Sequence, residues 1–175
     1  MLGLSRQVNP ELEHIEGDMR TLRLGREFDA VFVHDAVCYL TTEADLAAAM
    51  LTALVHCAPG GVALFAPDHV RDTFMQATDA GGNDGVDGRA LRYLEWTYDP
   101  DPFDSMYSVD YAYVLHEAGA APRSVSETHV CGLFSRADWL RLLDQAGFGA
   151  TAVLPFAHSE VPAGTLQVFI GRKPT

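Results

Sequence analysis

Hydrophobic positions in the first half of the chain fall into two unbroken runs with a periodic segment between them. Residues 28–33 are apolar apart from Asp29, and residues 62–66 are apolar throughout. Strands that are buried on both faces have this composition, which is typical of parallel strands in α/β proteins. The two runs therefore predict two buried strands.

The segment between these runs predicts a helix. Thr42 followed by Asp45 resembles a capping box, and Leu46 and Met50 continue at helical spacing. Residues 59–61, Pro-Gly-Gly, end the helix and reverse the chain. Because a strand, helix, strand order requires a right-handed crossover and parallel pairing, we expect an α/β fold with a doubly wound, mostly parallel sheet.

Two further segments of the first half are less regular. Residues 12–16 form a short, half-apolar run before Gly17 and predict a strand that stops where Asp18 emerges. Residues 70–88 are rich in Asp, Gly and Asn. Since no strand pattern precedes the glycines and no helical pattern follows them, we expect a mobile loop rather than a phosphate-binding loop.

The second half of the chain predicts an antiparallel layer followed by one helix and one strand. The layer consists of three segments rich in Tyr, Val and Thr that are separated by turn signals, namely residues 91–97, 106–115 and 124–133. Ser135 with Asp138 forms a second capping box, and it begins an amphipathic helix that ends at Gly147. Residues 166–171 predict the last strand.

The charge balance argues against several classes of partner. The chain has 12 Lys and Arg against 24 Asp and Glu, a net charge of -12, so its field repels nucleic-acid phosphates and anionic membranes. No apolar run approaches the roughly twenty residues that span a bilayer. Cys38, Cys57 and Cys131 are too far apart for a disulfide framework or a metal knuckle. We therefore expect a cytoplasmic protein with reduced thiols that binds neither nucleic acid nor membranes.

Two polar dipeptides stand where the predicted parallel strands end. His34-Asp35 follows the first buried strand and Asp68-His69 follows the second. In open parallel sheets ligands bind at this edge, so these residues are candidates for cofactor orientation or general-base chemistry. No tight His-x-His or His-x-x-x-His spacing supports a metal site, and we predict none, although a metal-dependent hydrolase that uses these four residues is a possible alternative.

The antiparallel layer carries polar residues on one predicted face. Glu127 and His129 lie two positions apart on a strand, so both side chains leave the same face. Tyr107, Tyr111 and Tyr113 share a face of the preceding strand in the same way. An aromatic row of this kind is more often core or interface than pocket.

Gly17-Asp18-Met19-Arg20, residues 28–35 and residues 58–65 together resemble the middle of a class I S-adenosylmethionine-dependent methyltransferase. Residues 127–134, followed by a helix that carries Trp139, are similar to the C-terminal half of small-molecule N-methyltransferases such as the nucleotide-sugar N,N-dimethyltransferases. The resemblance implies a Rossmann-like fold, S-adenosylmethionine as cofactor, and methyl transfer to a nitrogen or oxygen of a small-molecule substrate.

The resemblance also implies roles for single residues on the cofactor side. Asp18 and Met19 would flank the adenine of the cofactor, and His34 and Asp35 would border its methionine part.

On the acceptor side, the resemblance places Asp68, His69 and His129 toward the substrate. Either His69 or His129 would be the catalytic base that takes the proton lost by the acceptor. We expect Tyr107 and Glu127 to contact the substrate together with Asp68.

One domain, residues 1–175, accommodates all of these elements, because the chain has 175 residues and a hydrophobic content of 48%. Within it we expect a cofactor-side α/β part over residues 1–69, an antiparallel substrate-side layer over 89–134, and a C-terminal helix and strand over 135–175.

The sequence departs from the family at its N-terminus. The first strand, its glycine-rich loop and the acidic residue that binds the cofactor ribose have no counterpart in the sequence. We therefore expect an N-terminally truncated methyltransferase fold whose binding of S-adenosylmethionine is weak or absent. A sheet edge left bare would favour a homo-oligomer. The alternative of another class is a cofactor-less binding or scaffold module of methyltransferase descent.

Overall fold

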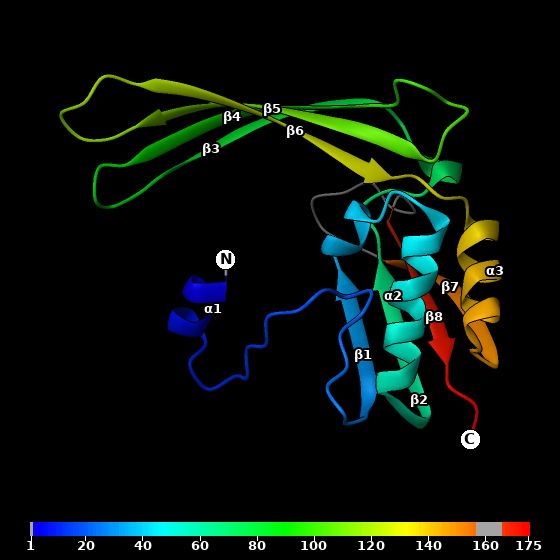
Figure 1. The fold of residues 1–175 in the computed structure, drawn as a ribbon. Helices are drawn as coiled ribbons and strands as arrows, with labels where there is room; N and C mark the ends of the chain where they lie inside the picture. Colours follow the sequence, from blue (N-terminus) through cyan, green and yellow to red (C-terminus); the bar gives the residue numbers. More distant parts are fainter. Residues whose placement is uncertain (1, 157–165) are drawn as a thin grey trace.

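The computed structural model describes residues 2–156 and 166–175 and shows two separate sheets, of which one lies across the strand ends of the other (Figure 1). The helices are α1 (Leu2–Val8), α2 (Glu43–His56) and α3 (Arg136–Ala146), with short 3-10 turns η1 (Ala36–Tyr39) and η2 (Arg71–Thr73). The strands are β1 (Phe28–His34), β2 (Cys57–Ala66), β3 (Ala77–Asp84), β4 (Ala90–Tyr98), β5 (Met106–His116), β6 (Arg123–Gly132), β7 (Ala150–Phe156) and β8 (Leu166–Arg172).

Sheet A contains the two strands predicted from the apolar runs. Its order is β1-β2-β8-β7, and β1 pairs with β2 in parallel, with Val31 opposite Ala63. The strand, helix, strand unit formed by β1, α2 and β2 is therefore confirmed. The C-terminal strand is also confirmed as β8, while β7 beside it was not predicted.

The expectation of a mostly parallel sheet is not confirmed. Among the described strands of sheet A, the β2–β8 and β8–β7 pairings are antiparallel, and β1–β2 alone is parallel. The cause is the short connection between β7 and β8, which is limited to residues 157–165. A parallel crossover needs a dozen or more residues, so β8 returns antiparallel beside β7.

Helices α2 and α3 lie side by side on one face of sheet A (Figure 1). Leu46 and Met50 of α2 and Leu143 of α3 are fully buried there. Trp139 stacks on Phe169 of β8 with ring centroids 4.7 Å apart. Burial of each such side chain stabilises the fold by about 1.5–3 kcal/mol, so this face holds the core.

The other face of sheet A is open at β1. Phe32 is 63% exposed, and an apolar cavity of about 890 Å³ extends from it across Leu64 to Ile170 and Leu154. A doubly wound sheet has helices on both faces. Because this face of sheet A is open at β1, the doubly wound arrangement stays a prediction.

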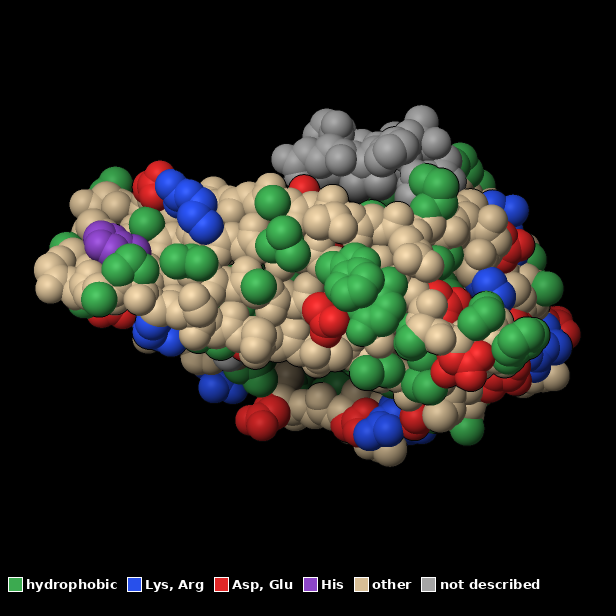
Figure 2. Space-filling view, turned by 90° about the horizontal axis from the view of Figure 1, so that it is seen from above, with side chains coloured by type: hydrophobic (Ala, Val, Ile, Leu, Met, Phe, Trp, Pro, Cys, Tyr) green, Lys and Arg blue, Asp and Glu red, His purple; other side chains and the backbone are tan. Residues whose placement is uncertain are grey.

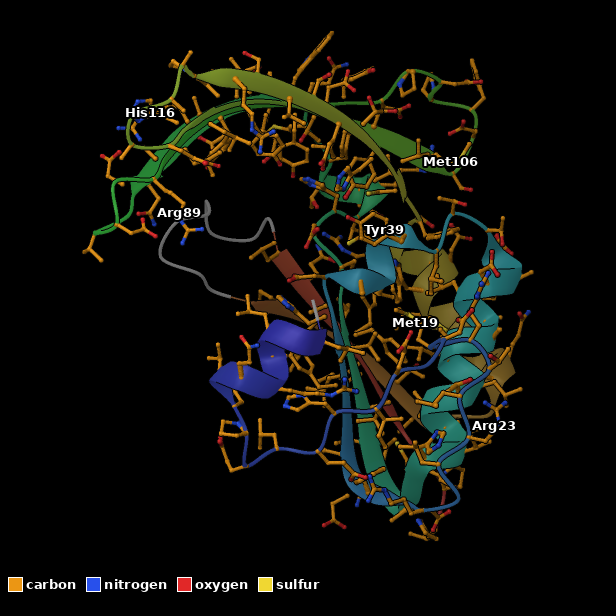
Figure 3. All side chains as sticks on the ribbon, turned by 60° about the vertical axis from the view of Figure 1, so that its left-hand side comes forward. Met19, Arg23, Tyr39, Arg89, Met106 and His116 are labelled. Atoms are coloured by element: carbon orange, nitrogen blue, oxygen red, sulfur yellow. The ribbon has the colours of Figure 1, made fainter. Side chains whose placement is uncertain are left out.

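Sheet B is the predicted antiparallel layer, with the order β3-β4-β5-β6. Its register places Trp96 opposite Asp110 and Tyr111 opposite Glu127. Odd-numbered residues of β4, β5 and β6 therefore share one face. Glu95, Tyr111 and His129 of that face line a cavity together with residues that follow β1 and β2, so it is the concave face, whose curvature Figure 3 shows. The even-numbered residues form the outer face, where exposed hydrophobic side chains such as Trp96 gather (Figure 2).

Two sequence predictions about local structure are wrong. Residues 77–84 form β3 rather than a mobile loop, and Gly81 there allows the Tyr93 ring to approach, since an added Cβ would lie 2.8 Å from Tyr93 Cε1. This edge strand is almost entirely exposed, so it lacks the apolar alternation that identifies a strand. Residues 12–16 form no strand, because they find no ladder partner among the described residues.

Arg71 helps to hold the two layers together. Its Nε donates to the carbonyl of Leu133 at 3.2 Å, and its Nη1 donates to that of Pro102 at 2.9 Å. Ser105 Oγ also donates to the carbonyl of Thr41 at 3.1 Å. These bonds fix the concave face of sheet B above the carboxyl ends of β1 and β2.

Candidate functional site

A cavity of about 310 Å³ lies between the two layers, above the ends of β1 and β2. Its floor comes from the segments after β1 and β2, and its roof comes from the concave face of sheet B. The lining residues on the floor are Asp35, Cys38, Tyr39, Asp68 and His69, and those of the roof are Glu95, Tyr107, Val109, Tyr111, His129 and Cys131. Five of the nine predicted site residues, Asp35, Asp68, His69, Tyr107 and His129, meet here.

The end of β1 carries an unusual backbone. Asp35 has a φ of 50°, and among the described non-glycine residues it alone has a positive φ. Such conformations cost free energy and cluster at functional sites. The Asp35 carboxylate lies beside the neighbouring His34, with Nδ1 of His34 2.8 Å from Asp35 Oδ1, and the two form an ion pair when His34 is protonated. His34 stacks on Phe32 and faces the open apolar cavity, so it lies beside the interlayer cavity rather than in it.

The end of β2 places two titratable groups on the cavity floor. Desolvation by the surrounding protein atoms raises the pKa of Asp68, and the nearby Asp35 charge adds to this. Desolvation also lowers the pKa of His69, which makes edge contacts with the rings of Phe74 and Tyr107. His69 is therefore neutral at pH 7 and can accept a proton.

The roof contains a short chain of hydrogen-bonding side chains. Tyr39 Oη lies 2.7 Å from His129 Nδ1, and His129 Nε2 lies 3.4 Å from Glu127 Oε2. Because a carboxylate only accepts, it favours the tautomer with its proton on Nε2, which leaves Nδ1 to accept from Tyr39. Glu127 is exposed behind His129 and does not line the cavity. Figure 3 shows Tyr39 beneath the concave face of sheet B.

Tyr107 is almost completely buried, with 1% of its surface exposed. Its hydroxyl is hydrogen-bonded to Cys131, and burial raises its pKa far above the usual value. Burial also raises the pKa of Cys38, whose Sγ accepts from the backbone N–H of Asp68 at 3.3 Å. These groups stay protonated and shape the cavity wall.

The charged groups that line the cavity are mainly acidic. Asp35, Asp68 and Glu95 contribute carboxyl groups to it, whereas no lysine or arginine of the described residues lines it. A low-dielectric cavity with this lining favours a cationic group or an amine over an anion. The arrangement can therefore hold a positively charged or basic ligand and can accept a proton from it.

Asp18 and Met19 lie away from this cavity. The Arg20 guanidinium donates to both Asp18 oxygens, with an Nη2–Oδ2 distance of 2.7 Å, and holds the pKa of that carboxyl at about 2. Arg20 also donates to Asp45 at 2.8 Å. Met19 lines a separate apolar cavity of about 320 Å³ between β1 and α2. The structure therefore does not bring these two residues together with the other candidates.

Sequence reasoning missed Glu95 and Tyr39. Glu95 shares a parity with Tyr93 on β4 and stands opposite Tyr111 on β5, so the register of sheet B was the signal that would have found it. Tyr39 lies in η1, a turn that carries no periodic pattern.

The described residues contain no group of three or more His, Cys, Asp or Glu arranged to hold a metal ion. In the same part of the chain, none of the helices has the length and apolar character needed to cross a membrane.

Comparison with known proteins identifies relatives of one kind. No protein-family model matches the chain. Over 148 residues it is 29% identical to a dTDP-3-amino-3,4,6-trideoxy-α-D-glucopyranose N,N-dimethyltransferase of Streptomyces venezuelae, a match that covers 84% of this chain and 61% of the relative. The chain thus spans about three fifths of the length of this curated relative.

Solved structures show the same relationship. The crystal structure of DesVI from Streptomyces venezuelae matches with a TM-score of 0.81 and 26% identity, over 99% of this chain and 70% of that one. CalS10, an S-adenosylmethionine-bound amino pentose methyltransferase from Micromonospora echinaspora, matches with a TM-score of 0.74 and 26% identity, over 97% and 69% of the two chains. In sequence and in fold, the chain is similar to the S-adenosylmethionine-dependent sugar N-methyltransferases.

Proposed function

We propose that this chain acts in the S-adenosylmethionine-dependent methylation of an amino group on a small sugar, in the form of a nucleotide sugar. The observation that carries the proposal is the interlayer cavity, which gathers three carboxyl groups and no lysine or arginine of the described residues at the ligand-binding edge of sheet A. The sugar substrates of the relatives support the identity of the acceptor.

The residues at the end of β1 fit the cofactor. S-adenosylmethionine supplies, when bound, an activated methyl group on a positively charged sulfur. Asp35, strained at the cavity floor and exposed, presents a negative charge suited to that sulfonium and to the amino group of the methionine part. His34 borders the same edge. Asp18 and Met19 remain our candidates for the adenine, although Asp18 would have to exchange its contact with Arg20 for the ligand.

An ammonium nitrogen has no lone pair, so the bound acceptor must give up one proton before its nitrogen can attack the methyl group. Two groups can receive that proton. In the first route, Tyr39 Oη accepts the proton of the amine and passes its own hydroxyl proton to His129 Nδ1. The imidazolium that results keeps its other proton on Nε2, where Glu127 stabilises it. In the second route, the neutral His69 takes the proton directly. Asp68 and Tyr107 contact the substrate and position it against these bases.

The finer features of the protein follow from the same proposal. We propose one domain over residues 1–175, with a cofactor side at 1–69, a substrate layer at 89–134 and a C-terminal part at 135–175. We also propose a doubly wound sheet, whose open face at Phe32 and edge strand β1 are available for further packing. The protein acts in the cytoplasm on a small molecule, binds no nucleic acid or membrane, and self-associates through the exposed sheet edge.

The alternatives of other classes have less support. A metal-dependent hydrolase built on His34, Asp35, Asp68 and His69 finds no supporting ligand group among the described residues. A cofactor-less scaffold module differs from the enzyme in one measurable property, which is affinity for the cofactor.

Calorimetric titration with S-adenosylhomocysteine tests the proposal. Each hydrogen bond to a charged cofactor group contributes about 1.5–3 kcal/mol, so we expect weak binding by this chain and micromolar binding by a chimera with a glycine-rich strand–helix segment of a sugar N-methyltransferase joined before Met1. A chimera that folds and binds no cofactor would favour the scaffold module. Micromolar binding by this chain alone would contradict the expected need for that segment.

A further inference from the structure

We propose that Glu95 of β4 is the residue that holds the positively charged amine of the acceptor and selects amino sugars over neutral sugars. The inference rests on the proposed function, and it adds a substrate-selecting residue that lies outside the cofactor side of the site.

The position of Glu95 directs it to the acceptor. It projects from the concave face of sheet B into the interlayer cavity, across from Asp68 on the floor. The ends of β1 and β2 form the opposite wall, where the cofactor side lies. A ligand held by Glu95 therefore sits between the roof and the floor, within the space that also contains Tyr39 and His69.

Glu95 has no counter-ion among the described residues. Other carboxylates form ion pairs, as in Asp84 with Arg92 at 2.9 Å and Glu43 with Arg141 at 2.7 Å. Glu95 is half-buried and forms no ion pair with any described residue. A carboxylate in a partly desolvated cavity gains most from a cationic partner, and the cavity leaves room for that partner to be a ligand.

Neighbouring groups hold Glu95 and complete a site for an ammonium group. Thr97 Oγ1 donates to Glu95 Oε1 at 3.2 Å, and the Tyr111 hydroxyl is hydrogen-bonded to the same carboxylate. These two donors fix the carboxylate but supply no positive charge. The rings of Tyr107 and Tyr111 line the cavity beside it, and aromatic faces attract cations. A carboxylate beside tyrosine rings binds an ammonium group more strongly than a neutral hydroxyl, because the hydroxyl offers it a hydrogen bond but no positive charge.

The same contacts could make Glu95 a purely structural residue that orders Tyr111. The two roles differ in one readout, because a structural residue affects every ligand equally, whereas an ammonium-binding residue affects the amine alone. Comparing an amino sugar with its neutral analogue separates them.

The experiment titrates the full chain with kanosamine, an amino sugar, and with glucose, which has a hydroxyl in place of the amino group, and follows binding by NMR. We expect the wild-type chain to prefer kanosamine by about tenfold or more, the scale of one hydrogen bond to a charged group. Glu95→Gln keeps the side-chain shape and should reduce that preference to near unity, with glucose binding unchanged. Glu95→Asp should retain part of the preference.

Asp110→Asn is the matched control. Asp110 lies on the outer face of sheet B, so the substitution removes the same charge from the same sheet away from the cavity. It should leave the preference for kanosamine intact.

Each outcome separates the inference from the proposed function. A wild-type preference that is lost in Glu95→Gln and kept in Asp110→Asn supports the assignment. A preference that survives in Glu95→Gln overturns the role of Glu95 and leaves amine methylation standing. If the wild-type chain itself does not distinguish kanosamine from glucose, the assignment of Glu95 and the amino-sugar acceptor are both overturned.

Discussion

Replacing Gly132 by alanine tests whether the close contact between the two layers shapes the cavity. Gly132 ends β6, and an added Cβ would lie 2.7 Å from Phe134 Cε2 and closer still to the carbonyl oxygen of Leu40. Contacts below 3.0 Å are essentially never seen for real Cβ atoms. Leu40 and Phe134 are both buried, so neither can turn aside. The backbone between η1 and α2 must move instead.

The expected cost follows from this geometry. Overpacking costs about 1–3 kcal/mol, and the upper part of that range applies because the obstacle is backbone. Alanine also reduces the conformational entropy of the unfolded chain, which offsets about 0.4–1 kcal/mol of this loss. We therefore expect Gly132→Ala to lower the free energy of unfolding by about 2 kcal/mol. Because η1 carries Cys38 and Tyr39, the same shift should also weaken kanosamine binding.

Urea denaturation followed by circular dichroism measures the effect, with the midpoint expected to fall and the slope to stay constant. Gly3→Ala is the control, since nothing lies within 4 Å of a Cβ added at that position. It should be neutral or slightly stabilising in α1. Equal midpoints for Gly132→Ala and Gly3→Ala would refute the close contact between the layers.

Three further predictions concern single side chains. Burial lowers the pKa of His69 below its ordinary value of 6.5, so the unfolded chain takes up its proton first as the pH falls. Stability should therefore be full above about pH 6.5 and decline below it. His69→Phe should flatten that decline in urea titrations at several pH values, and an unchanged decline would contradict the shift. Tyr39→Phe should lower the methyl-transfer rate of the cofactor-binding chimera by about tenfold to a hundredfold. The melting temperature should change little, because the Tyr39 side chain is exposed. An unaffected rate would rule out the Tyr39–His129 route. Ser135→Ala removes the capping box of α3 and should cost about 1 kcal/mol of unfolding free energy, whereas Ser135→Asp should restore most of it.

The sequence predicts the parts of the fold that are governed by local patterns. β1 and β2 follow from apolar runs, and the starts of α2 and α3 follow from their capping residues, where Thr42 and Ser135 each accept from the backbone N–H three positions on. In these cases burial and capping act over neighbouring residues, so the sequence alone contains the information.

Long-range pairing explains what the sequence does not predict. β3 is a strand because β4 lies beside it, and residues 12–16 are not a strand because they have no ladder partner among the described residues. The β8 strand runs antiparallel because the connection to β7 is short. None of these causes is visible in the composition of the segment itself.

The candidate site shows the same division. Asp35, Asp68 and His69 could be predicted because strand ends are readable in the sequence, whereas His34, predicted in the same way, lies beside the cavity. Glu95 could not, since its entry into the cavity depends on the register between β4 and β5. The cavity combines residues of two sheets that are far apart in the sequence. Their proximity therefore becomes visible only in the tertiary structure.

Transfer of an isotopically labelled methyl group tests the central claim most directly. The cofactor-binding chimera is incubated with labelled S-adenosylmethionine and a nucleotide-linked amino sugar, and NMR locates the label in the product. We predict that the label appears on the amino nitrogen, and that two methyl groups accumulate in sequence. A label on a hydroxyl oxygen, or no label on the sugar although the chimera binds the cofactor, would contradict the account.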